Sequence, residues 1–332
     1  MLSETNQDIL YGQSNNRRLP PWLKKDFRNL RRHDVKRLLR KGHLHTVCES
    51  AKCPNIFECF SKPTAAFMIL GDVCTRNCSF CAVPGGSPLP VNPFEPQEVA
   101  KAAGEMRLKH VVITSVTRDD LEDGGAKQFA LTVNAVKKMN PLVIVEILTP
   151  DFEPQKIIAE NERENLPLIP SLAMRGNGVV NKSYTKHIEK ILNELFETSK
   201  PDIYNHNVET VPRLYHRVRP QADYNKSLKL LATVKKLVPE IITKSGIMAG
   251  LGEEFEEIVE VMRDLRNVGC DAITIGQYLQ PSKNHLPVEK YIYPEVFDQY
   301  KESGKILGFK YMASGPFVRS SYNAEQQVRS QS

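Results

Sequence analysis

Between residues 65 and 308 the chain alternates short apolar runs with longer segments in which apolar positions recur every three or four residues. The apolar runs predict strands at 65–71, 110–116, 141–148, 202–209, 240–252 and 271–279. The helical periodicity predicts helices at 96–109, 126–140, 223–238, 253–269 and 294–308. Strands that are apolar throughout are typical of a parallel sheet covered by helices. The pattern therefore predicts an α/β fold with six βα units, a partial (β/α)6 TIM-like barrel whose carboxyl-edge loops carry the function.

The segments outside this rhythm divide the chain into three parts. Residues 1–62 are polar and basic and then cysteine-rich, so we expect an N-terminal extension folded against the barrel. The barrel itself is expected over 63–309. Within it, 153–200 is longer than one crossover requires, and we interpret it as an insertion. Residues 310–332 are expected to form a C-terminal tail.

Composition narrows the class of protein. The chain has 332 residues, 41% hydrophobic and 25% charged, which is ordinary for a globular protein. No apolar run approaches the roughly 18 residues of a membrane helix, so no membrane partner is expected. The first residues have no apolar core and carry Glu4 and Asp8, unlike a signal or transit peptide, so we expect a cytoplasmic location. In that reducing compartment, seven cysteines indicate metal binding or catalysis before disulfides.

Charge is unevenly distributed. The formal net charge is +6, and the segment from Arg17 to Lys41 contains only Asp26 and Asp34 as acidic residues. Such a segment is either a solvated arm or a docking surface for an acidic partner. Nucleic acid is not expected as a partner, because no aromatic residues are interleaved with these basic ones to form a stacking platform.

A cysteine triplet follows the first predicted strand. The stretch "CTRNCSFC" places Cys74, Cys78 and Cys81 with the spacing C-x3-C-x2-C. A structural zinc site takes four ligands and a disulfide framework an even number, whereas three thiolates fill three corners of a four-iron cubane and leave one iron open. Phe80 adds an apolar face beside that iron. A zinc site remains the alternative.

This spacing resembles that of the radical S-adenosylmethionine superfamily. In that superfamily the open iron chelates S-adenosyl-L-methionine, and transfer of one electron to it yields a 5′-deoxyadenosyl radical. The stretch "GIMAGLGE" at 246–253 resembles the superfamily's glycine-rich motif near the adenine, which makes Gly250 a candidate for cofactor binding. Close packing within the protein is the alternative explanation of these glycines.

A second triplet precedes the barrel. Cys48, Cys53 and Cys59 have the spacing C-x4-C-x5-C, which indicates a second cluster, with a zinc knuckle or a site shared by both triplets as alternatives. Cys270 stands alone at the start of a predicted strand, and we expect it to be structural.

The two triplets together resemble the lipoyl synthase family. So do "CPNIFEC", "FMILGDVCTRNCSFC", "TSVTRDDLEDGGA", "PDIYNHNVETVPRLYHRVRPQADY" and "GPFVRSSYNAE". The likeness runs from about residue 20 to 324 and leaves out 153–200. It implies insertion of two sulfur atoms at C6 and C8 of an octanoyl group that is bound to a lysine of a carrier domain. The second of two 4Fe–4S clusters is then the sulfur source.

The resemblance also implies roles for individual residues. The first triplet holds the radical-generating cluster, and Cys48, Cys53 and Cys59 hold the sacrificial one. Ser320 is expected to complete the second cluster from the tail, with Ser321 as ligand, or simple docking of the tail, as alternatives. Candidate cofactor or substrate contacts are Asn205, His206, Asn207, Arg219 and Arg118. A satisfied strand end would explain the first three equally well, and a loop ion pair would explain Arg118.

The implied partners are octanoylated carrier domains of 2-oxoacid dehydrogenases, the glycine cleavage H protein, a reduced donor of flavodoxin or ferredoxin type, and iron–sulfur assembly or carrier proteins. Two other functions stay open. The second cluster of a different radical enzyme could carry electrons or anchor substrate without donating sulfur. A two-cluster electron-transfer protein is the other alternative, although it would normally supply four cysteines for each cluster.

Overall fold

The computed structural model describes residues 11–13, 19–24, 33–61, 66–154, 180 and 182–321. An eight-stranded sheet forms its centre, in the order β10-β8-β7-β6-β5-β4-β3-β2. The parallel strands are β3 (Ala66–Ile69), β4 (His110–Ser115), β5 (Ile144–Leu148), β6 (Ile203–Asn205), β7 (Ile242–Ala249), β8 (Ala272–Gln277) and β10 (Tyr311–Gly315). The short β2 (His45–Thr46) pairs antiparallel with β3 at one edge. Since β3 and β10 are not neighbours in this sheet, the barrel is open, and the predicted partial α/β barrel is confirmed.

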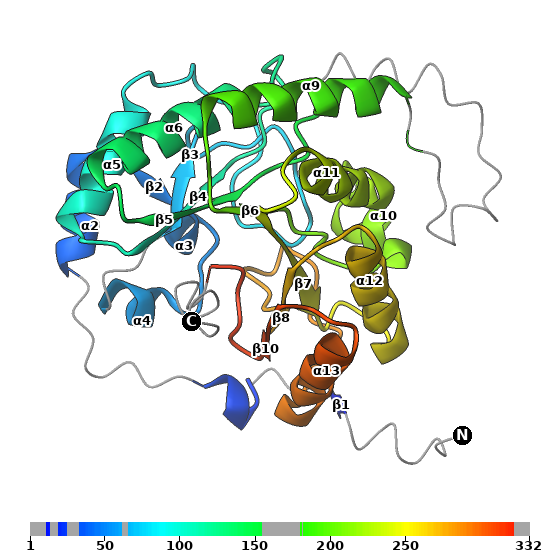
Figure 1. Ribbon diagram of the computed structural model, residues 1–332. Helices are drawn as coiled ribbons and strands as arrows, with labels where there is room; N and C mark the ends of the chain where they lie inside the picture. The colour runs from blue at the N-terminus through cyan, green and yellow to red at the C-terminus, as the bar shows by residue number, and fades with distance from the viewer. Residues whose placement is uncertain are drawn as a thin grey trace.

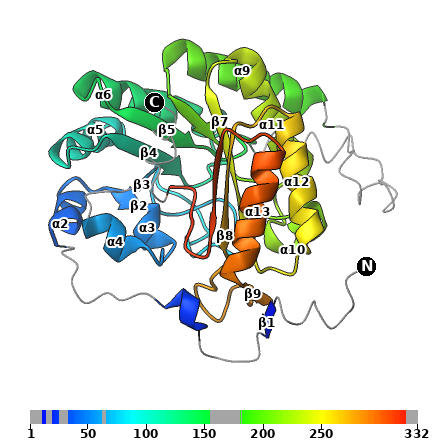
Figure 2. The same cartoon turned by 60° about the horizontal axis from the view of Figure 1, so that its bottom comes forward.

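Helices cover the outer face of the sheet (Figures 1 and 2). The crossover helices are α5 (Glu95–Glu105), α6 (Ala126–Met139), α9 (Lys182–Thr198), α11 (Tyr224–Leu237), α12 (Phe255–Asn267) and α13 (Pro294–Ile306). The N-terminal elements η1 (Pro21–Leu23), α2 (His33–Lys41), α3 (Val47–Ser50) and α4 (Ile56–Ser61) precede β3, and α2 to α4 lie near its edge of the sheet. The smaller elements are η2 (Pro212–Leu214), α10 (Tyr215–Val218) and the antiparallel pair β1 (Tyr11–Gln13) and β9 (Lys290–Ile292).

Local sequence explains these elements. Every residue of β8 is buried, as expected for a strand covered on both faces. The helix α12 buries Ile258, Val261, Met262 and Leu265, which recur at helical spacing and face the sheet. Its first turn is closed by a capping box between Glu254 and Glu257. These packed layers bring the carboxyl ends of the parallel strands to a common edge.

All six predicted strands and five predicted helices are confirmed, with shifts of a few residues at their ends. Among the crossover helices and the parallel strands, two were not predicted, and neither were the N-terminal and smaller elements. The helix α9 is the crossover from β5 to β6 and occupies the end of the segment interpreted as an insertion, of which 155–179 and 181 lie outside the described residues. The strand β10 joins the sheet at a place expected to be tail; its half-buried "YMASG" lacks a strand-like apolar run. Parts of the basic segment (17–18 and 25–32) and of the tail (322–332) also lie outside the description.

In the described part of the chain, no helix has both the length and the apolar content needed to span a bilayer.

Candidate active site at the carboxyl edge of the sheet

The first cysteine triplet lies in the loop that follows β3, at the carboxyl edge of the sheet. Backbone bonds close this loop, because Cys74 N–H donates to Pro84 O at 2.8 Å and Gly86 N–H donates to Cys74 O at 2.9 Å. Burial, and after it the charges of Cys78 and Cys74, raise the pKa of Cys81 to about 12. Cys81 N–H also donates to Cys78 O at 3.0 Å, so one closed loop carries all three thiols.

The surroundings of the triplet fit a thiolate cluster. The backbone N–H groups of Arg76 and Thr117 point at Cys74 Sγ, at 3.4 and 3.3 Å. Hydrogen bonds of this kind to cluster sulfur tune iron–sulfur centres. In the described ranges no three His, Cys, Asp or Glu side chains are arranged to hold a metal ion, so the group that this triplet binds stays a prediction.

The carboxyl edge also presents unsatisfied polar atoms. Ser115 Oγ, Asn207 Oδ1, Thr210 Oγ1 and Arg219 Nε are buried without a hydrogen-bond partner among the residues described. Buried polar atoms are nearly always paired in folded proteins. These four atoms, at the end of β4 and in the residues that follow β6, are therefore expected to contact a bound polar molecule.

Arg76 anchors the cysteine loop, and sequence reasoning missed it. Its Nε and Nη2 donate to the two carboxylate oxygens of Asp119, at 2.8 and 3.0 Å, and its Nη1 donates to Asp151. Arg76 is only 4% exposed, and its partners follow β4 and β5. The loop between Cys74 and Cys78 is thus bound to two neighbouring strand ends. The sequence did indicate this residue, because Arg76 is a long cationic side chain inside the cysteine motif.

The candidate residues at and after the end of β6 have their side chains in two different environments. His206 Nδ1 contacts Thr149 O at 2.9 Å, and its Nε2 lies 3.3 Å from Asp151 Oδ1. Arg219 Nη2 lies 3.7 Å from the same oxygen, so His206 and Arg219 meet at the anchor of the cysteine loop. Asn205 instead donates to Glu146 Oε1 at 2.8 Å, which makes it part of a buried network below the site.

Glu209 is the second residue that sequence reasoning did not single out. It has a left-handed φ of 65°, which is uncommon for a residue with a side chain and is often found at functional sites. Burial raises the pKa of its carboxyl group, against the opposing effects of Arg219 and of Asn207, whose Nδ2 donates to it at 3.0 Å. Its charge acts on both Cys81 and Arg319. Glu209 therefore lies between the first triplet and the C-terminal tail.

The second triplet is held by the N-terminal elements. Cys48 lies on α3, Cys59 lies on α4, and Cys53 lies between them. Burial, then the charge of Cys53 and, more weakly, that of Cys59, raise the pKa of Cys48 to about 12. The structure thus places these three cysteines in one N-terminal segment, separate from the loop that carries the first triplet.

The C-terminal tail crosses beside this second triplet. Asn55 Nδ2, between Cys53 and Cys59 in the sequence, donates to Phe317 O at 2.7 Å. Arg319 interacts electrostatically with Cys53. Ser320 and Ser321 are both half-buried in the same stretch of tail. The tail therefore carries both candidate serines toward the cysteines that they are expected to assist.

Three residues that were predicted to lie at the cofactor make contacts with other parts of the protein. Arg118 Nε and Nη2 donate to Asp120 at 2.9 and 2.8 Å, so the guanidinium forms the local ion pair that was the alternative interpretation. A Cβ on Gly250, whose φ is 103°, would lie 2.3 Å from Gln277 Nε2, which is a packing reason for the glycine. Phe80 packs, partly buried, against the core. Roles for these residues in cofactor binding stay predictions.

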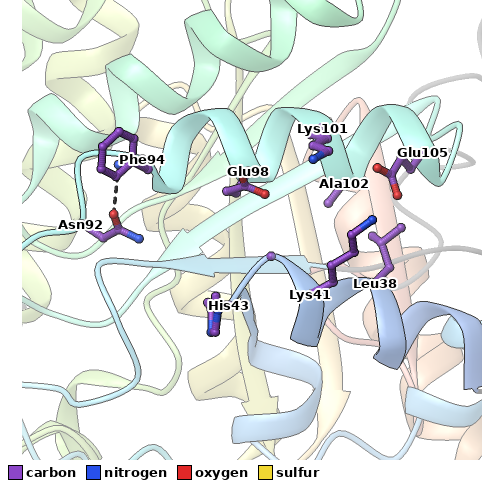
Figure 3. A pocket seen from close by; sticks show the side chains of 10 residues that line it. Leu38, Lys41, His43, Asn92, Phe94, Glu98, Lys101, Ala102 and Glu105 are labelled. Carbon is purple, nitrogen blue, oxygen red and sulfur yellow. Dashed lines mark hydrogen bonds between the residues drawn. The ribbon is translucent and has the colours of Figure 1, made fainter.

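A surface groove of about 350 Å³ lies elsewhere, between α2 and α5 (Figure 3). Its lining includes Lys41, His43, Phe94, Glu98 and Lys101, and none of the predicted site residues. The groove is therefore separate from the site around the cysteines.

Comparisons with known proteins bear on the family to which the chain belongs. Residues 68–265 match the model of the radical SAM superfamily. The lipoyl synthase of Alkaliphilus metalliredigens is 50% identical over 315 residues, which cover 94% of this chain and 96% of that protein. The lipoyl synthase of Caldanaerobacter subterraneus subsp. tengcongensis is 51% identical over 308 residues, covering 93% and 96%.

Among solved structures, methylornithine synthase is similar with a TM-score of 0.52 at 13% identity, over 86% of this chain and 75% of that one. The hydrogenase maturase HydG has a TM-score of 0.50 at 12% identity, over 87% and 67%. At such identities these likenesses support the fold alone. The near relatives and the superfamily match show the family and the class of activity: the chain is a sulfur-inserting radical enzyme that belongs to the lipoyl synthase family.

Proposed function

We propose that this chain inserts sulfur at C6 and C8 of an octanoyl-lysine on a carrier domain, using S-adenosylmethionine and two 4Fe–4S clusters. The observation that carries the proposal is the course of the C-terminal tail, which Asn55 of the second-triplet segment holds at Phe317 O and Lys244 of the barrel holds at Ser320 O. Glu209 acts electrostatically on Cys81 of the first triplet and on Arg319, which in turn interacts with Cys53 of the second. When bound, one cluster with S-adenosylmethionine would supply abstraction of hydrogen from unactivated carbon, and the other would supply sulfur.

The chain's own residues have positioning tasks in this proposal. Cys74, Cys78 and Cys81 bind the first cluster in a loop fixed by Arg76. The unpaired atoms of Asn207 and Arg219 contact the cofactor or substrate. The barrel interior keeps water and competing hydrogen donors away from the target carbons.

The second cluster is bound by Cys48, Cys53, Cys59 and Ser320 in this proposal. A serine oxygen matches iron of such a cluster less well than a thiolate does, so it leaves more readily when sulfur must be shed. The packing of the tail against Asn55 supports serine as the fourth ligand, because it brings this stretch to the right cysteines.

The protein partners are also part of the proposal. Octanoylated domains of 2-oxoacid dehydrogenases and the glycine cleavage H protein are the substrates, and a flavodoxin or ferredoxin supplies electrons. Iron–sulfur assembly proteins rebuild the second cluster. Arg40 and Lys41 are exposed on α2 and can attract an acidic carrier domain.

Anaerobic reconstitution tests cluster number. Replacing Cys48, Cys53 and Cys59 together with alanine should halve the bound iron and preserve cleavage of S-adenosylmethionine. Cys270→Ala is the matched control, since Cys270 is fully buried outside both triplets and its loss should leave iron content unchanged. Loss of cleavage in a folded triple variant would contradict independent clusters.

Single turnover tests the sulfur source. With the second cluster assembled from isotopically labelled sulfide, the label should appear in an octanoyl-lysine peptide. Ser320→Ala should still cleave S-adenosylmethionine but fail to form the two-sulfur product, whereas Ser320→Cys should hold the cluster and release sulfur poorly. Unlabelled product would favour the alternative in which the second cluster is not a sulfur donor. An active Ser320→Ala with an inactive Ser321→Ala would move the ligand by one residue.

A further inference from the structure

A buried lysine reaches from the sheet to the backbone of the C-terminal tail. Lys244 belongs to β7, and its side chain is 3% exposed. Its Nζ donates to Ser320 O at 2.5 Å, a contact between residues 76 positions apart in the sequence. This is the same residue whose side chain is the candidate ligand of the second cluster.

The charge of this lysine is balanced inside the barrel. Glu146 on β5, whose side chain is fully buried, lies 3.1 Å from Lys244 Nζ. Asn205 Nδ2 on β6 donates to Glu146 at 2.8 Å, and His110 Nε2 on β4 lies 3.2 Å from it. Four adjacent strands thus hold one ammonium group in place. A charged hydrogen bond from so rigid a donor orders its acceptor more strongly than a neutral one would.

Two further contacts hold the same stretch of tail. Asn55 Nδ2 donates to Phe317 O at 2.7 Å from the segment of the second triplet. On β8, Gly276 leaves the space that the tail occupies, since a Cβ there would lie 2.0 Å from Val318 O. The tail is therefore held on one side by the cysteine segment and on the other by β7 and β8. Of these three contacts, the one made by Lys244 falls on Ser320 itself.

We propose that Lys244, neutralised by Glu146, is a positioning residue that fixes the backbone of Ser320 and so presents its side chain to the second cysteine triplet. Holding the carbonyl of Ser320 restricts the movement of its backbone and therefore the positions that its hydroxyl can reach. The assignment of Ser320 as a cluster ligand belongs to the proposed function, and this inference rests on it. The part played by Lys244 is measurable without the clusters.

The test uses the full chain with Lys244→Met/Glu146→Gln, because Lys244→Met alone would leave a buried carboxylate unpaired. Amide hydrogen exchange of the cluster-free protein should show about ten- to a hundredfold less protection in residues 317–321, the effect of losing one charged hydrogen bond. Lys235→Met is the matched control. Lys235 also pairs with a buried carboxylate, Asp271, at 2.5 Å, but on the α11 side of β7, so its loss should leave the tail unchanged.

A second, spectroscopic experiment examines the second cluster alone, in protein whose Cys74, Cys78 and Cys81 are replaced by alanine. The Mössbauer signal of the iron site that is not bound by cysteine should change in the Lys244/Glu146 variant as it does in Ser320→Ala. Unchanged tail protection in that variant would overturn the inference. So would a native iron signal in that variant when Ser320→Ala alters it. If Ser320→Ala itself leaves the signal native, the ligand assignment in the proposed function fails, and the two failures are thereby distinguished.

Discussion

Substituting Gly276 by alanine should detach the C-terminal tail from the sheet while leaving the barrel intact. Gly276 lies on β8, where a Cβ would meet Val318 O at 2.0 Å and Arg319 Nη1 at 3.0 Å. The strand cannot retreat, because it pairs with β7 on one side and with β10 on the other. The tail must therefore move.

The magnitude follows from these distances. Ordinary contact begins near 3.4 Å, so the carbonyl of Val318 has to withdraw by roughly 1.4 Å. A shift of that size stretches the bonds from Lys244 to Ser320 O and from Asn55 to Phe317 O, now 2.5 and 2.7 Å, beyond useful length. Losing one charged and one neutral hydrogen bond costs about 2–4 kcal/mol locally.

Amide hydrogen exchange measures this loss directly. Protection of residues 317–321 should fall about thirty- to a thousandfold in Gly276→Ala, given tenfold for each 1.4 kcal/mol. Gly315→Ala is the matched control, because Gly315 pairs with Gly276 and its Cβ would meet only Val318 Cγ2 at 3.4 Å. We also expect Gly276→Ala to cleave S-adenosylmethionine without forming the two-sulfur product. Equal tail protection in the two variants would refute the reasoning.

Three further predictions follow from other parts of the site. Arg76→Gln strips two buried carboxylates of their cation and should lower the free energy of unfolding of the cluster-free protein by about 3–5 kcal/mol in urea titrations; a loss under about 1 kcal/mol would contradict the anchoring role. Reversing the charges of Arg40 and Lys41 should weaken salt-dependent binding of an acidic octanoylated carrier domain but spare turnover of a short octanoyl-lysine peptide, and equal losses on both substrates would reject docking at α2. Burial alone would raise the pKa of Glu146, but the neighbouring lysine and histidine hold this pKa at about 2. Because this folded-state pKa lies below the unfolded value of about 4.3, the carboxylate stabilises the fold fully above about pH 4.3. About 3 kcal/mol of the free energy of unfolding should be lost as the pH falls from there toward 2. Urea titrations of Glu146→Gln should not show this loss.

The residue pattern was sufficient for most of the fold because burial in a parallel sheet is a local property of each run. Strands such as β8 are apolar along their whole length, and helices such as α12 repeat their apolar positions every three or four residues. The strand β10 escaped prediction because its five residues are all half-buried and do not form an apolar run. The cysteine spacing was equally local, and it was enough to predict two separate triplets.

Only the tertiary structure decided how these parts work together. Arg76 meets carboxylates 43 and 75 positions away, and Lys244 meets Ser320 across 76 positions. Gly250 and Arg118, singled out for the cofactor, turn out to have partners within the protein. Contacts of this kind depend on strand register and on which loops meet at a shared edge. Neither is specified by any short stretch of sequence, because each arises only when several strands are aligned in one sheet.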